Sequence, residues 1–325
     1  MVNEARGPMA QAREHDGGWA RSLLGRLLAD RLGAFGLLLV VLLVVGAIGA
    51  DVLSAHSPTA LSIRNRLQPP DWLHPLGTDH LGRDIFARVL HGGRIALVVS
   101  LSAVGGAVLC GTLLGMVAGY GPRWLDNVLI LLFDVVRSFP TVLFALAVLT
   151  LTGPSLLTIV LVVVVTTIPV YGRIVRTQTL AMKGQEFILA ERAMGAGPMR
   201  VLALHVLPNL IGPLFILAER ALGAGPARVL AQHILPNLIG PLLILASMEV
   251  PVVITIESGL SFLGLGVRPP TPSWGSILND GYSFIRDTPW PVIAAGVPIV
   301  LTTLGFTFLG EALRDIVDPK LSVRP

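Results

Sequence analysis

The chain has 325 residues, of which 53% are apolar and only 14% are charged, and its mean hydropathy is +0.75. Soluble globular chains carry roughly a quarter charged residues, so this composition excludes a soluble globular protein. The formal net charge of +4 does not indicate nucleic-acid binding, because the basic residues form no cluster with interleaved aromatics. The apolar residues fall in several separate runs, which predicts an all-α protein that crosses a bilayer repeatedly.

The first apolar run, Leu32 to Ala50, contains no charged residue and is long enough to span a membrane once. We expect a cytoplasmic tail over residues 1–31 and a first transmembrane helix over 32–54. A signal peptide is the alternative, but its apolar region is shorter, roughly 7–15 residues. The end of the tail fits two alternatives equally well, an interfacial amphipathic helix and a frayed terminus. It would contain Trp19, Leu23, Leu24, Leu27 and Leu28 with Arg21, Arg26 and Arg31.

Five further spans are predicted, with an outer loop over residues 55–94 and a transmembrane domain over 95–313. The second span carries Gly111, Gly115 and Gly119, a four-residue repeat that favours close helix packing. The third contains Pro140 near its middle. The approximate limits of the second to sixth spans are 95–120, 124–152, 156–171, 238–263 and 291–309, followed by a cytoplasmic tail over 314–325.

The distribution of basic residues predicts that both termini are cytoplasmic. With the N-terminus inside, the inner segments contain 16 Lys and Arg residues and the outer segments contain seven, as the positive-inside rule requires. The first outer loop is nevertheless more basic than this rule favours.

A tandem repeat lies between the fourth and fifth spans. Residues 188–215 (ILAERAMGAGPMRVLALHVLPNLIGPLF) are followed at once by 216–243 (ILAERALGAGPARVLAQHILPNLIGPLL), and 23 of 28 positions are identical. Two copies are too few for a solenoid. We expect the extra copy to stay cytoplasmic or interfacial, since a single added crossing would invert the last two spans. An artefact of sequence assembly is the alternative, but five differences between the copies favour real divergence.

The chain contains no recognisable catalytic constellation. Its single cysteine, Cys110, lies in an apolar run, which excludes an intrachain disulfide and a cysteine-based metal site. Neither of its two lysines, Lys183 and Lys320, follows a glycine, so the phosphate-binding P-loop is missing. The motifs of serine hydrolases and zinc peptidases are missing too. We therefore expect a protein that is not an enzyme, with no catalytic residue and no metal or cofactor of its own.

Three stretches resemble the permease subunits of ABC importers for dipeptides, oligopeptides, nickel and glutathione. They are 74–97 (HPLGTDHLGRDIFARVLHGGRIAL), 257–278 (ESGLSFLGLGVRPPTPSWGSIL) and 308–321 (FLGEALRDIVDPKL). The resemblance covers about residues 20–322 and implies the six-helix type I permease fold. It also implies a bacterial or archaeal inner (plasma) membrane location and a share in an ATP-driven pathway. The implied partners are a homologous permease, two ATPase subunits that use ATP and Mg²⁺, and an extracytoplasmic solute-binding protein.

The repeat is similar to the cytoplasmic EAA loop of this family, which forms a coupling helix that docks on the ATPase. Both copies keep the family spacing of Gly and Leu-Pro, but Leu replaces the first Glu and Glu replaces the last Ala. The second copy is favoured as the docking one, because it runs directly into the fifth span. The resemblance assigns coupling roles to Leu189, Ala190, Glu191 and Gly195 in the first copy and to Leu217, Ala218, Glu219 and Gly223 in the second.

Several polar residues are candidates for the translocation path or its gate. Ionisable residues at membrane depth suggest a functional or water-facing site, but Asp134 and Arg137 are three residues apart and are equally suited to pairing with each other. Three roles are open for Glu257: it lines the translocation path, it is a protonated carboxyl, or it forms a hydrogen bond to a neighbouring helix. The gate and path candidates are Asp134, Glu257, Ser258, Phe262 and Trp274, while the roles of Asp126, Arg137 and Glu249 stay open.

A group of acidic and histidine residues in the outer loop invites a metal-site interpretation. Pro75 and two glycines should prevent these side chains from converging, so a structural role and contact with the solute-binding protein are favoured instead. The group comprises His74, Asp79, His80, Asp84 and His91.

The sequence therefore predicts an importer permease that hydrolyses no ATP itself. A secondary transporter is the alternative, and it would need an essential carboxylate near the membrane midplane and no ATPase. A membrane enzyme is a third interpretation, which the missing catalytic motifs oppose. The solute itself, a peptide or related molecule such as a nickel chelate or glutathione, is not determined by the sequence.

Overall fold

The computed structural model describes residues 24–183 and 235–317, and this part of the chain is helical with no β-strand. Five helices are long and apolar enough to cross a membrane, and a bent pair adds a sixth span. The six predicted spans are thus accounted for. The long helices are α3 (Arg31–Ile48), α5 (Ile85–Tyr120), α8 (Leu156–Lys183), α14 (Leu235–Phe262) and α16 (Trp290–Val317), and the bent pair is α6 (Arg123–Ser138) with α7 (Thr141–Thr152).

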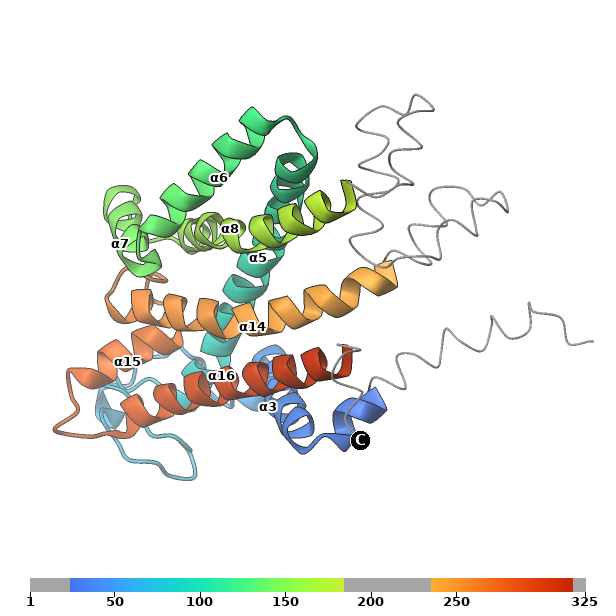
Figure 1. Ribbon diagram of the computed structural model, residues 1–325. Coiled ribbons are helices and arrows are strands. Elements are labelled where there is room, and N and C mark those ends of the chain that lie inside the picture. Colours follow the sequence, from blue (N-terminus) through green and yellow to red (C-terminus); the bar gives the residue numbers. More distant parts are fainter. Residues whose placement is uncertain (1–23, 184–234, 318–325) are drawn as a thin grey trace, which may run out of the picture.

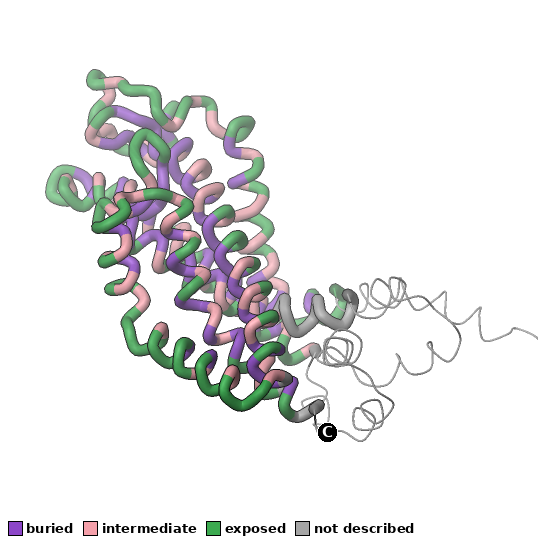
Figure 2. Tube along the Cα trace, turned by 90° about the horizontal axis from the view of Figure 1, so that it is seen from above, coloured by how far each residue is buried: buried purple, intermediate pink, exposed green. Residues whose placement is uncertain are grey.

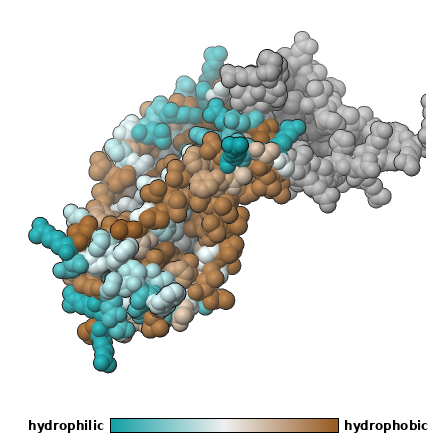
Figure 3. All heavy atoms as spheres, turned by 90° about the horizontal axis from the view of Figure 1, so that it is seen from below, coloured by the Kyte–Doolittle hydropathy of each residue, from teal (hydrophilic) through white to brown (hydrophobic). Residues whose placement is uncertain are grey.

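Helix α14 occupies the centre of the bundle. It packs against α16, α5 and the short helix α15 (Trp274–Tyr282), and Figure 1 shows it between α8 and α16 with α5 passing behind. Buried residues follow the spans in Figure 2, and the buried apolar side chains of α5, α8, α14 and α16 belong to one continuous core. Exposed apolar side chains cover the outside, including Leu42, Leu109 and Leu161. Figure 3 shows the resulting broad hydrophobic surface, with hydrophilic side chains gathered at both ends of it.

The second span begins ten residues earlier than the sequence predicted. Helix α5 starts at Ile85, because the Asp84 carboxylate accepts a hydrogen bond from the Ala87 amide and caps the helix. Pro75 and the two glycines that lie between His74 and His91 precede this helix in non-helical backbone, with φ of +77° at Gly77 and +71° at Gly82, as the sequence predicted. Other helices also extend past their predicted limits, with α8 reaching Lys183 and α16 reaching Val317.

The predicted third span is broken at the proline that the sequence contains. Helices α6 and α7 meet at Phe139 and Pro140 with a bend of 86°. Proline has no amide hydrogen to donate, and it disfavours helical backbone in the residue before it. The two halves consequently point in different directions (Figure 1).

The glycine repeat of α5 packs against α8, as its four-residue spacing predicted. A Cβ atom on Gly111 would lie 2.7 Å from the Cβ of Tyr171, and one on Gly119 would lie 2.6 Å from the Cβ of Thr179. The two helices run in the same direction over this contact, which is the largest in the described bundle.

The described chain ends lie at one end of the bundle. The start of the described chain, the end of α8, the start of α14 and the end of α16 all lie on the right in Figure 1. Residues 54–84 and α15 lie at the opposite end, and we call these two segments the polar cap. The predicted interfacial helix falls partly outside the described residues, and its described part, residues 24–29, is helical.

Candidate functional site

The candidate site lies where the polar cap meets the end of α14. Glu257 is 1% exposed, and its carboxylate accepts a 2.7 Å hydrogen bond from the Ser261 hydroxyl, one turn further along the helix. Ser258 is also buried, with its hydroxyl 3.5 Å from the same carboxylate. Both of these partners lie on α14 itself, and the choice among the roles considered for Glu257 stays open.

Helix α15 packs closely against this end of α14. Ser273 begins α15 with a capping box, in which Ser273 and Ser276 bond reciprocally to each other's backbone amides. A Cβ atom on Gly275 would lie only 2.0 Å from the carbonyl oxygen of Ser258. Only glycine permits so close an approach, so the first turn of α15 is fixed in position beside Glu257.

Trp274 joins α15 to α5. Its side chain is 2% exposed, and the indole N–H donates a 2.9 Å hydrogen bond to the carbonyl oxygen of Val89. The ring lies against Gly92, where a Cβ atom would approach the Trp274 Cδ1 atom to 2.8 Å. A buried tryptophan stabilises a junction through its large apolar surface, and the hydrogen bond of its N–H fixes the orientation of the ring.

A group of four charged side chains, of which Asp280 is half-buried and the other three are buried, reinforces the same junction. Arg83 and Arg88 each donate a 2.6 Å hydrogen bond to the Asp79 carboxylate. Both also reach Asp280 on α15, at 2.8 and 3.2 Å. The two positive and two negative charges compensate one another, and this pairing offsets the free-energy cost of removing the ions from water.

Ion pairs account for three of the five arginines that make the first outer loop unexpectedly basic. Arg83 and Arg88 are neutralised by carboxylates, and Arg94 donates to Asp51 at 2.7 Å. Hydrogen bonds to the Arg94 guanidinium and, as the second largest cause, to His91 lower the pKa of the Asp51 carboxyl below its usual value. Sequence analysis missed Arg83, Arg88 and Asp280 as a set, although the excess of arginine in this loop was the signal that could have found them.

The acidic and histidine residues of the loop do not converge as one group. His74 pairs with Asp84 at 3.0 Å, and His56 stacks on His74 with ring centroids 4.7 Å apart. His80 stacks on Phe284, while His91 pairs with Asp51. The smaller sets that do have ligand atoms within 4.8 Å of one another are His56 with His74 and Asp84, and Asp79 with His80 and Asp280.

The central carboxylate of each smaller set is already engaged. Asp84 accepts from His74 and from the Ala87 amide, and Asp79 accepts from two arginines and two backbone amides. These bonds give the loop the structural role that the sequence favoured.

The other gate candidates lie in two different places. Phe262 is half-buried at the end of α14, with its ring edge-on to Tyr282 at 6.0 Å. Its carbonyl oxygen accepts a hydrogen bond from Asn279 of α15. Asp134 lies far away on α6, is exposed, and pairs with Arg173 of α8 rather than forming the considered pair with Arg137. Beside that pair, Asp126 binds Arg176, so two ion pairs join α6 to α8.

The coupling residues of both repeat copies, 189–195 and 217–223, lie outside the described residues. Their roles stay predictions.

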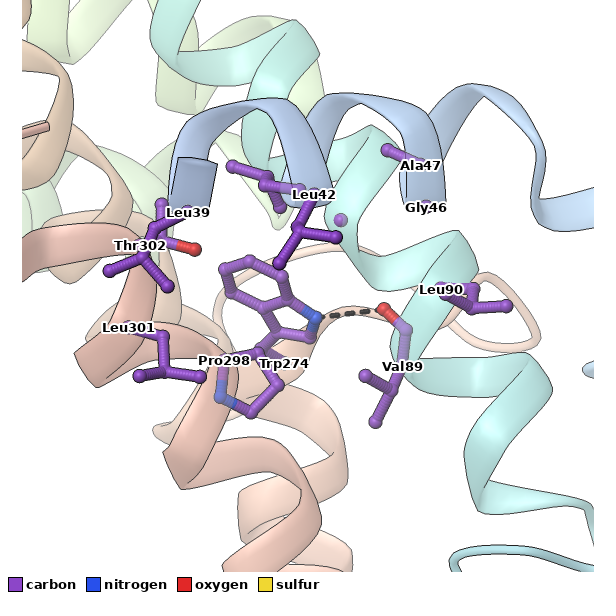
Figure 4. Close-up of a pocket in the computed structure, with 12 residues that line it drawn as sticks. Leu39, Leu42, Gly46, Ala47, Val89, Leu90, Trp274, Pro298, Leu301 and Thr302 are labelled. Atoms are coloured by element: carbon purple, nitrogen blue, oxygen red, sulfur yellow. Dashed lines mark hydrogen bonds between the residues drawn. The ribbon is translucent and has the colours of Figure 1, made fainter. Parts of the chain in front are cut away.

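An apolar pocket opens beside Trp274. It has a volume of about 190 Å³ and lies between α3, α5 and α16. Figure 4 shows the indole at its centre, with Leu42 above it and Pro298 and Val89 beside it.

Comparison with known proteins identifies the chain's family. The model of the family described as binding-protein-dependent transport system inner membrane component matches residues 111–219 and 215–323. These matches cover more than half of the chain and meet at the junction between the two repeat copies. The chain belongs to this family. It is therefore a multi-pass inner-membrane permease, as the resemblance implied. Residues 19–70 additionally match the N-terminal transmembrane domain of oligopeptide transport permease C.

Individual relatives align over nearly the full length. The dipeptide transport system permease protein DppC of Alkalihalophilus pseudofirmus is 35% identical, over 93% of this permease and 90% of the relative. A putative peptide permease of Brucella suis is 34% identical, over 94% and 92%. The di/tripeptide transport system permease DppC of Pseudomonas aeruginosa is 32% identical, over 90% of each chain.

Proposed function

We propose that this permease is the membrane subunit of an ATP-driven ABC importer that carries short peptides. The observation that carries the proposal is the near full-length similarity to peptide permeases. The sequence has no P-loop of its own, so the energy must come from separate ATPase subunits. A second permease completes the pathway, and a solute-binding protein delivers the peptide from outside.

Both termini and the repeat are proposed to face the cytoplasm. In support, the described ends of the chain share one end of the bundle (Figure 1). The ATPases would then bind the repeat, and α8 and α14, which flank it, would carry the movement into the bundle. The rigid junction between α14, α15 and α5 would make the polar cap move with α14 as one unit.

Reconstitution tests this function directly. The permease is purified with its genomically neighbouring subunits, placed in proteoliposomes, and assayed for uptake of a radiolabelled dipeptide with binding protein outside and ATP inside. Uptake should require ATP and both ATPases. Uptake driven by an ion gradient without ATPases would instead identify a secondary transporter and overturn the proposal.

The repeat is tested by deleting one copy at a time. Because one docking helix per permease suffices, chains lacking residues 188–215 or 216–243 should each still co-purify with the ATPases. Uptake should be retained better when the second copy remains. Loss of ATPase binding in both deletion chains would show that the extra copy is required.

A further inference from the structure

The apolar pocket beside Trp274 is built almost entirely from hydrocarbon. Its volume of about 190 Å³ exceeds that of an engineered cavity of about 150 Å³ that stays dry and binds benzene. A buried water needs two to four polar partners, which such walls do not supply. Its lining includes Leu39, Leu42, Ala47, Gly93, Trp274 and Leu301.

The pocket follows the part of α3 that is long and apolar enough to span a membrane, close to the end of that span. Immediately beyond Gly93, the guanidinium of Arg94 donates to the carbonyl oxygens of Ala47 and Ile48 and to the carboxylate of Asp51. Asp51 is exposed, so this charged group marks the end of the apolar zone. From Ala47 the pocket follows α3 inward to Leu39, over about 12 Å of helix at 1.5 Å per residue.

The rim of the pocket continues into the lipid-facing surface. Leu42 is 58% exposed and Leu301 is 40% exposed, although both line the pocket. An apolar hollow that opens sideways from spanning helices meets acyl chains rather than water. A polypeptide segment would bring backbone N–H and C=O groups that these walls cannot satisfy.

We infer that the pocket holds one acyl chain of a membrane phospholipid, lodged between α3 and α16 against the indole of Trp274. The bound chain fills the space that these helices leave and contacts the Trp274 side chain. Because Trp274 fixes α15 to α5, the bound lipid also affects how firmly the polar cap is held.

Quenching by brominated lipid tests this inference. The single-tryptophan chain carries Trp19→Phe, Trp72→Phe, Trp124→Phe and Trp290→Phe, and is studied with its co-purifying subunits in nanodiscs. Phosphatidylcholine brominated in mid-chain should quench Trp274 fluorescence by at least twofold relative to unbrominated lipid.

Filling the pocket provides the matched control. A Cβ atom on Gly93 meets only ordinary contacts of 3.5 Å, to Ala47, Leu43 and Trp274, so Gly93→Ala should fold and reduce the quenching partly. Gly93→Leu should reduce it at least twofold further. A second single-tryptophan chain that keeps only the exposed Trp124 should respond equally with and without these substitutions.

Two results would overturn the inference. Absence of quenching at Trp274 in the assembled complex would show that a protein segment or a collapsed wall occupies the pocket. Quenching that Gly93→Ala and Gly93→Leu leave unchanged would show that the bromines act from the general lipid surface.

Discussion

The α-carbon of Gly115 faces the carbonyl oxygen of Gly172 so closely that a Cβ atom on Gly115 would lie 2.5 Å from that oxygen. The obstacle is backbone, which no rotamer change can move. Gly115→Ala should therefore push α5 and α8 apart and lower the free energy of unfolding by about 1–3 kcal/mol. Thermal unfolding of the purified complex measures this.

Gly105→Ala is the matched control for this substitution. It lies on the same helix, and nothing comes within 4 Å of its added Cβ. Alanine favours helix over glycine by about 0.5–1 kcal/mol, so the melting temperature should stay unchanged or rise. Equal loss in both variants would show that the glycine repeat has no packing role.

The glycine repeat shows what sequence could predict and what it could not. Spacing of four residues puts Gly111, Gly115 and Gly119 on one helical face, which is enough to predict a close helix contact. Spacing does not identify the partner, because the contact with α8 depends on how the whole bundle folds. The start of α5 was misplaced for a related reason. Arg88 and Arg94 look like loop residues until their partners on α3, on the short helix α4 (Ala50–Leu53) and on α15 are known.

Trp274→Phe should loosen the polar cap. The substitution removes the indole N–H and leaves the buried Val89 carbonyl oxygen without that donor, which costs about 1–3 kcal/mol. Trp124 is 66% exposed, so Trp124→Phe should change stability by less than about 0.5 kcal/mol. Hydrogen exchange should locate the Trp274→Phe effect in α15 and the start of α5. A uniform effect over all helices would contradict a local anchoring role.

Removing the two carboxylates of the charged group one at a time should lower the free energy of unfolding by different amounts. The Asp79 side chain is 2% exposed and compensates two arginines, so Asp79→Asn should cost about 3–5 kcal/mol. The Asp280 side chain is 27% exposed, and Asp280→Asn should cost less because water replaces part of its interaction. Asp287→Asn, at an exposed position shortly after α15, is the control. Thermal unfolding ranks the three, and a larger loss for Asp280→Asn would refute this order.

The gate candidates mark another limit of sequence reasoning. Glu257, Ser258 and Trp274 were selected because polar and aromatic residues stand out in an apolar chain, and the structure does bring them together at one junction. It also buries them within the subunit. Sequence could not separate a residue that lines a path from one that holds two helices together, since both require the same polar side chain at membrane depth. Phe262 and Tyr282, at the exposed edge of this junction, are better placed to meet a partner or solute.

The two ion pairs between α6 and α8 should differ in strength, because one is more sheltered from water. Asp126 and Arg176 have side chains 16% and 27% exposed, whereas those of Asp134 and Arg173 are 57% and 45% exposed. Exposed pairs contribute about 0–1 kcal/mol. Asp126→Asn should therefore lower the melting temperature more than Asp134→Asn does.

Exchange of the charges separates pairing from any other role of these residues. Asp126→Arg alone should be strongly destabilising, because it places two arginines together, and adding Arg176→Asp should restore part of the loss. Since α8 leads directly into the repeat, dipeptide uptake in proteoliposomes should fall with Asp126→Arg and recover in the exchanged chain. Recovery of stability without recovery of uptake would mean that the carboxylate at position 126 acts in transport itself. Failure to recover either would show that the ion pair does not hold α6 to α8.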